Sequence, residues 1–135
     1  MSEKILKLIE ELEQFDHKNL YQDDFFHTWD KSQDELKAIW KLADILRAMR
    51  EENISPKIFD SGIGISLFRD NSTRTRFSFA SACNLLGLEV ADLDEGKSQI
   101  AHGETVKETA NMISFMADVI GIRDDMYIGK GLSLI

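Results

Sequence analysis

The chain has 135 residues, of which 43% are hydrophobic and 30% are charged, as is typical of about one globular domain. Its 24 acidic and 16 basic side chains give a formal charge of −8, which argues against nucleic acid or an anionic membrane as the main binding partner. No apolar run is long enough to cross a bilayer, and the first residues alternate charges instead of forming a signal-peptide core. We therefore expect a cytoplasmic protein, in which the single cysteine, Cys83, is buried without a disulfide partner.

The first fifty residues predict two helices joined by an irregular connector over residues 16–31. The second helix starts at Ser32, because Glu35 follows it at the spacing of a capping box, and it runs to Arg50 before the only proline, Pro56. Apolar side chains recur at helical spacing in both segments. The expected stripes are Ile5, Leu8, Ile9, Leu12 and Phe15 in the first helix, and Leu36, Ile39, Trp40, Ala43, Leu46 and Met49 in the second.

From residue 62 onward, short apolar strands alternate with helices of about fourteen residues, which indicates βαβ units. The fold class is therefore α/β, a partial doubly wound parallel sheet of about three strands, flanked by helices and preceded by the N-terminal helices. Three strands are few for such a fold, so we expect a fragment. The expected strands are 62–68, 88–92 and 118–122, and the expected helices are 72–86 and 104–117; the expected domains are an extension and connector over 1–31 and an incomplete domain over 32–135.

Polar side chains follow the ends of the predicted strands, where open α/β sheets bind their ligands. Ser72 is the natural N-cap of the helix after the first strand, and the N–H groups of that helical turn attract anions. Thr73 and Thr75 add hydroxyls, Arg74 adds a forked cation, and Arg123 follows the third strand. The sequence predicts a phosphate- or carboxylate-binding edge, although Ser72 as a mere cap with solvated arginines remains the alternative.

Two other polar stretches predict no further site. The acidic run 92–95 has no histidine ligand in register, so no metal is expected there, and the glycines around Lys130 lack the flanking residues of a P-loop. We expect no cofactor.

The segment Ser72-Thr73-Arg74-Thr75-Arg76 resembles the Ser-Thr-Arg-Thr-Arg signature of the aspartate/ornithine carbamoyltransferase family. Downstream, Ser98-Gln99-Ile100-Ala101-His102 resembles the ornithine-type loop, and Gly103-Glu104-Thr105 resembles the aspartate-type loop. Arg123 falls where the family keeps a phosphate-binding arginine. Roughly residues 20–123 follow the amino-terminal domain of the family. Residues 32–135 would then be an incomplete carbamoyl phosphate-binding domain, without the carboxyl-terminal domain that selects the second substrate.

The resemblance implies an enzyme that transfers the carbamoyl group of carbamoyl phosphate to an amine or amino acid. It places Thr75 and Arg123 at the carbamoyl oxygen as catalytic residues. It also implies a homotrimer, because the loop after the second strand reaches the neighbouring active site; His102, a lysine in aspartate-type enzymes, points away from a strict aspartate carbamoyltransferase. The implied phosphate ligands are Ser72, Thr73, Arg74, Thr75 and Arg123, and the residues from the adjacent subunit are Ser98, Gln99 and His102.

Two departures from the family pattern limit this interpretation. Ala80 stands where the family usually has a glutamate, which leaves the role of Arg76 open. The His-Pro-X-Gln motif that completes the carbamoyl phosphate site does not occur, so we expect the chain by itself to be inactive. Two other hypotheses remain: a stand-alone anion-binding or regulatory module, and a structural protein in which residues 1–50 drive oligomerisation and the arginines only cap.

Overall fold

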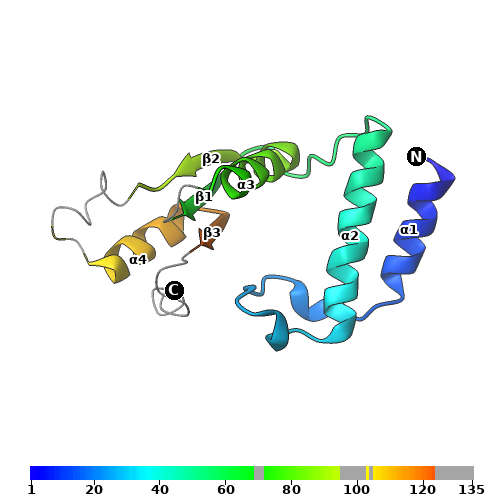
Figure 1. The fold of residues 1–135 in the computed structure, drawn as a ribbon, viewed down its shortest axis with the longest axis horizontal. Helices are drawn as coiled ribbons and strands as arrows, with labels where there is room; N and C mark the ends of the chain where they lie inside the picture. The colour runs from blue at the N-terminus through cyan, green and yellow to red at the C-terminus, as the bar shows by residue number, and fades with distance from the viewer. Residues whose placement is uncertain (69–71, 95–102, 104, 124–135) are drawn as a thin grey trace. The chain divides into compact units, whose positions relative to one another are not determined.

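The computed structural model of the chain describes residues 1–68, 72–94, 103 and 105–123. The chain divides into two compact units, Met1–Pro56 and Lys57–Ile135, which we describe separately (Figure 1). The domain boundary predicted between residues 31 and 32 stays a prediction. None of the helices in the described ranges has the length and apolar character that a membrane crossing requires.

The first unit contains helices α1 (Glu3–Glu13) and α2 (Gln33–Glu51), and each begins at a serine that caps its N–H groups. The Ser2 hydroxyl accepts a hydrogen bond from the Ile5 N–H at 3.3 Å. At the start of α2, the Glu35 N–H donates to Ser32 Oγ at 3.1 Å, and the Ser32 N–H donates to Glu35 Oε2 at 2.6 Å. These reciprocal bonds satisfy donors that the first helical turn leaves without partners, and they confirm the predicted capping box.

The core of the first unit lies between α1 and α2, and its buried members are Ile5, Ile45 and Ala48. The apolar stripe predicted for α1 is confirmed for Ile5, Leu8, Ile9 and Leu12, which face this core, whereas Phe15 lies beyond the end of α1 and is not part of it. The stripe predicted for α2 is wrong in part, since Trp40 is 73% exposed and Ala43 is also exposed. Apolar residues occur on more than one side of α2, so their spacing does not tell which side meets α1. The partly buried side chains around this core are Leu8, Ile9, Leu12, Met49 and Ile54.

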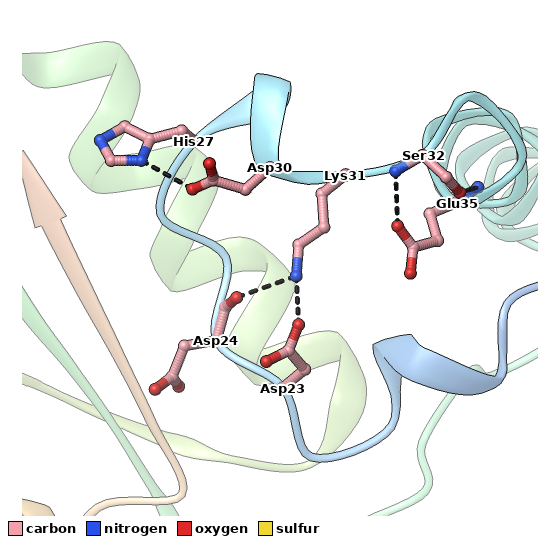
Figure 2. Close-up of polar contacts among 7 residues, drawn as sticks. All are labelled: Asp23, Asp24, His27, Asp30, Lys31, Ser32 and Glu35. Atoms are coloured by element: carbon pink, nitrogen blue, oxygen red, sulfur yellow. Dashed lines mark hydrogen bonds and ion pairs between the residues drawn. The ribbon is translucent and has the colours of Figure 1, made fainter.

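The segment between α1 and α2, expected to be irregular, contains two single turns of 3₁₀ helix, Lys18–Leu20 and Thr28–Asp30. The Lys31 ammonium holds this segment together: it pairs with the Asp23 carboxylate and donates to the Asp24 carbonyl at 3.0 Å (Figure 2). The hydrogen bond between Lys31 and Asp23 lowers the pKa of Asp23 and raises the pKa of Lys31. The Lys31 side chain thus links the two parts of this irregular segment, because it contacts both Asp23 and Asp24.

The second unit is built on three parallel strands, in the spatial order β2–β1–β3 (Figure 1). Its elements are β1 (Ile63–Phe68), α3 (Thr73–Leu86), β2 (Glu89–Asp92), α4 (Val106–Met116) and β3 (Val119–Arg123). The central strand β1 pairs with both neighbours, and five of its six residues are buried. The predicted α/β class and parallel sheet are confirmed, with element ends within two residues of the expected ones.

Helix α3 packs on the sheet through Cys83, which is 4% exposed, as predicted. The packing is close, because a Cβ atom added to Gly64 of β1 would lie 2.6 Å from the Cys83 sulfur. Burial raises the pKa of the Cys83 thiol, so this cysteine is a packing residue of low reactivity. Phe68 and Phe79 add an edge-to-face aromatic contact at a centroid distance of 5.7 Å.

We predict that Gly87→Ala destabilises the second unit. Gly87 ends α3 with φ +100°, a left-handed conformation that costs other residues about 1–2 kcal/mol, and an added Cβ would lie 2.0 Å from the Phe59 carbonyl oxygen. Thermal unfolding followed by far-UV circular dichroism checks this. Gly87→Asn relieves only the backbone strain, so it should also destabilise, whereas the exposed helical control Ser81→Ala should not. A wild-type melting curve for Gly87→Ala would contradict the prediction.

A second prediction concerns one of the ion pairs between the two helices of the first unit, that of Lys41 with Glu11. Lys41 Nζ lies 2.6 Å from Glu11 Oε2, and this hydrogen bond lowers the pKa of Glu11 below 4.5. A carboxyl with a lowered folded-state pKa stabilises the fold above its unfolded pKa, and that contribution is lost as pH falls through the folded value. The destabilisation caused by Glu11→Gln should therefore be present at neutral pH and shrink as the pH falls below 4.5.

Urea unfolding followed by tryptophan fluorescence checks this, because both tryptophans, Trp29 and Trp40, lie in the first unit. Glu10→Gln, an exposed change on the same helix, is the matched control. If the difference between wild type and Glu11→Gln stayed constant across this pH range, the stated role of the pair would be wrong.

Candidate functional site

The carboxyl ends of the three parallel strands meet at one edge of the sheet. In the register of the sheet, Phe68 at the end of β1 lies beside Arg123 at the end of β3, and Ser66 lies beside Asp92 at the end of β2. Ligands of open α/β sheets bind at this edge. The edge therefore collects side chains from three separate stretches of sequence.

The first turn of α3 stands at this edge with Ser72 as its cap. Ser72 Oγ accepts from the Thr75 N–H at 3.5 Å and shares a hydrogen bond with Thr75 Oγ1 at 2.8 Å. Thr73 and Arg74 occupy the same turn and are exposed. N–H groups in a first helical turn point along the helix axis, and the helix dipole adds positive potential there, so the turn favours an anion.

Arg123 connects β3 to this turn. Its guanidinium Nη1 donates to Thr75 Oγ1 at 2.7 Å, and both residues are partly buried. Because Arg123 uses an acceptor position of the Thr75 oxygen, the hydroxyl hydrogen of Thr75 is directed to Ser72 Oγ or to an oxygen that arrives from outside. A cation and two hydroxyls from segments 48 residues apart thus form one group of hydrogen-bond donors.

Arg76, one turn further along α3, contacts the other two strands. Its Nη2 donates to the Phe68 carbonyl at 2.9 Å, and its Nη1 lies 2.5 Å from Asp92 Oδ1. Ser66 donates to the same carboxylate oxygen at 2.7 Å. Sequence reasoning missed Ser66 and Asp92. A usable signal existed, because both residues lie at or near the ends of predicted strands, but the register that pairs them is a tertiary fact.

The structure brings together Ser72, Thr75 and Arg123 of the predicted site, with Thr73 and Arg74 in the same helical turn. Their roles as ligands stay predictions. In the described part of the chain, no three potential metal-ligating side chains gather into a cluster. The predicted contributors from the adjacent subunit, Ser98, Gln99 and His102, lie outside the described residues.

Comparison with known proteins identifies a family. Residues 23–132 match the protein family described as "Aspartate/ornithine carbamoyltransferase, carbamoyl-P binding domain". The candidate carbamoyltransferase YgeW of Escherichia coli (strain K12) is 69% identical over 113 residues, which are 84% of this chain and 28% of YgeW. The aspartate carbamoyltransferase catalytic subunit of Clostridium acetobutylicum is 38% identical over 91 residues, 67% of this chain and 29% of its own length.

A solved structure gives the same result for the fold. The aspartate transcarbamoylase of Trypanosoma cruzi in complex with carbamoyl phosphate superposes with a TM-score of 0.68 at 26% identity, covering 78% of this chain and 33% of that one. The resemblance stated from the sequence is therefore confirmed. The chain spans at most 33% of the length of each of these three proteins.

We predict that Ser72→Ala lowers the stability of α3 by about 1 kcal/mol, the usual cost of losing a serine cap. The alanine removes the acceptor for the Thr75 N–H and the hydroxyl bond to Thr75. Hydrogen exchange of the amides in the first half of α3 measures the loss, because opening of this helix is seen there directly. Ser72→Asn retains a side-chain acceptor and should exchange nearly as slowly as wild type. Equal protection in the alanine variant would show that Ser72 is not a working cap.

Proposed function

The chain belongs to the aspartate/ornithine carbamoyltransferase family, and we propose that it binds carbamoyl phosphate at the carboxyl edge of its sheet and takes part in carbamoyl transfer to an amine. The observation that supports this most directly is the bond from Arg123 to Thr75 beside the cap at Ser72. It places a guanidinium and a hydroxyl next to a helical turn that favours anions. The acceptor amine is an amino acid or a related compound.

The proposed phosphate ligands lie in or beside the first turn of α3. Phosphate oxygens would accept from the N–H groups of this turn, from the hydroxyls of Ser72 and Thr73, and from the forked cation of Arg74. Arg123 would join them from β3. This arrangement suits a phosphorylated metabolite, because several fixed donors share the charge of one small anion.

The proposed reaction requires hydrogen-bond donors at the carbamoyl oxygen, and Arg123 and Thr75 can supply them. When an amine attacks the carbamoyl carbon, negative charge grows on the carbamoyl oxygen, and the bond to phosphate then breaks as phosphate leaves. Donors fixed where that charge develops stabilise the transition state more than the ground state. Since Arg123 already donates to the Thr75 oxygen, the Thr75 hydroxyl hydrogen can be donated either to Ser72 Oγ or to the carbamoyl oxygen.

Assembly and location complete the proposal. We propose a cytoplasmic homotrimer in which Ser98, Gln99 and His102 reach the phosphate of a neighbouring subunit, as the family resemblance implies. The chain spans 28% of the length of YgeW, so turnover is proposed for the protein in its full-length form.

We predict that Thr75→Val in the complete protein lowers kcat by about 100- to 1000-fold, the usual effect of losing one donor to a developing oxyanion. Valine keeps the shape of threonine and removes the hydroxyl that Arg123 contacts. The measurement is product formation from carbamoyl phosphate with a panel of amine acceptors. Thr75→Ser keeps the hydroxyl and should retain most of the activity, and Ser81→Ala, an exposed change further along α3, serves as the control.

Calorimetric titration with carbamoyl phosphate separates this function from its alternatives. Saturable binding that is lost in Arg74→Ala supports the anion site. Binding without turnover for any acceptor would instead favour the anion-binding module, and no heat at millimolar ligand would leave the arginines with a structural role only.

A further inference from the structure

Arg76 makes contacts that the proposed function leaves unused. It is the second of the two cations in the signature segment, yet its guanidinium is directed to the strands: Nη2 donates to the Phe68 carbonyl at 2.9 Å, and Nη1 lies 2.5 Å from Asp92 Oδ1. One planar group thus fixes the ends of β1 and β2 relative to α3. A guanidinium suits this task, because its donors lie in a rigid fork.

Asp92 is itself held in place from the sheet. Ser66, which is 3% exposed and lies beside Asp92 in the register of β1 and β2, donates its hydroxyl to Asp92 Oδ1 at 2.7 Å. The same oxygen therefore receives Ser66 from one side and Arg76 from the other. The side chains of Arg76 and Asp92 are 37% and 45% exposed, and ion pairs as wet as this contribute little to overall stability. The main effect of the pair is on geometry.

Arg76 transmits this geometry to the cap. Its backbone N–H donates to the Ser72 carbonyl at 3.2 Å, so Arg76 and Ser72 are joined through one helical turn, and Thr75 lies between them. The contacts of the Arg76 side chain with the ends of β1 and β2 therefore also hold in place the helical turn that carries Ser72 and Thr75. Arg123 contacts the same turn from β3, through its bond to Thr75.

We infer that Arg76, bridged to Phe68 and Asp92, is a positioning residue of the anion site and does not contact the bound anion. The bracket formed by Ser66, Asp92 and Arg76 orients the first turn of α3 for the phosphate. This inference rests on the proposed function and adds to it a division of labour among the arginines. It also explains why an acidic residue, Asp92, lies beside an anion site: its carboxylate holds the Arg76 guanidinium in place.

Removing Asp92 should change the affinity for the anion in opposite directions, depending on whether Arg76 is a ligand of the anion or a positioning residue. If Arg76 were a ligand of the anion, removing Asp92 would release a cation and delete a repulsive charge, and the anion would bind more tightly. If Arg76 is a positioning residue, removing Asp92 loosens the turn, and the anion binds more weakly.

The experiment titrates carbamoyl phosphate, and inorganic phosphate as a second probe, into the complete protein and its variants. We expect Asp92→Asn and Arg76→Met each to raise Kd about tenfold, since each breaks the bracket. The Kd of the double variant Arg76→Met/Asp92→Asn should not exceed the larger of the two Kd values of the single variants, because both changes remove the same interaction. Glu89→Gln removes the same charge from the opposite end of β2 and should leave Kd within about twofold.

Tighter or unchanged binding by Asp92→Asn would overturn the inference, as would fully additive losses in the double variant. If Asp92→Asn does not fold, Ser66→Ala replaces it; this change leaves the ion pair intact and should weaken binding in the same direction. Wild-type protein that binds neither probe would refute the proposed function alone. The positioning role is then decided by hydrogen exchange at the Arg76 N–H, which should speed up at least tenfold in Asp92→Asn while α2 stays unchanged, and equal exchange would refute it.

Discussion

Parallel pairing of β1 with both of its neighbours is the constraint on which the candidate site depends. The pairing sets Phe68 beside Arg123 and Ser66 beside Asp92, so that the ends of three strands share one edge. Only in this register does Arg123 reach the Thr75 hydroxyl in the first turn of α3. A shift of one residue would turn each side chain of β3 to the other face of the sheet.

An acidic protein can bind an anion when its positive groups are concentrated and oriented. The chain carries a formal charge of −8, yet the first turn of α3 adds helix-dipole potential to Arg74 and Arg123. Asp92 offsets the charge of Arg76 in the same region. Counting arginines therefore overstates the local charge, and the geometry of the donors matters more than their number. Steering over long distances contributes less than contact, because salt screens exposed charges.

The family relationship supports the proposed anion site at this edge. The match over residues 23–132 concerns the carbamoyl phosphate-binding domain, and the chain spans 28% of YgeW. In the proposed function, this domain holds the phosphorylated substrate. Site residues in an α/β fold follow strand ends, so one scaffold can keep the same phosphate turn while the acceptor changes.

The sequence by itself determined the elements of this protein: alternating apolar strands and capped helices predicted the α/β class, and the signature around Arg74 predicted the family. These signals are local, because a cap or an apolar period needs only neighbouring residues. Tertiary structure decided what lies far apart in the chain. It chose which side of α2 meets α1, which leaves Trp40 exposed, and it paired Arg76 with Asp92. Such contacts depend on sheet register and helix packing, and these cannot be predicted from any single stretch of sequence because they join residues that are far apart in the chain.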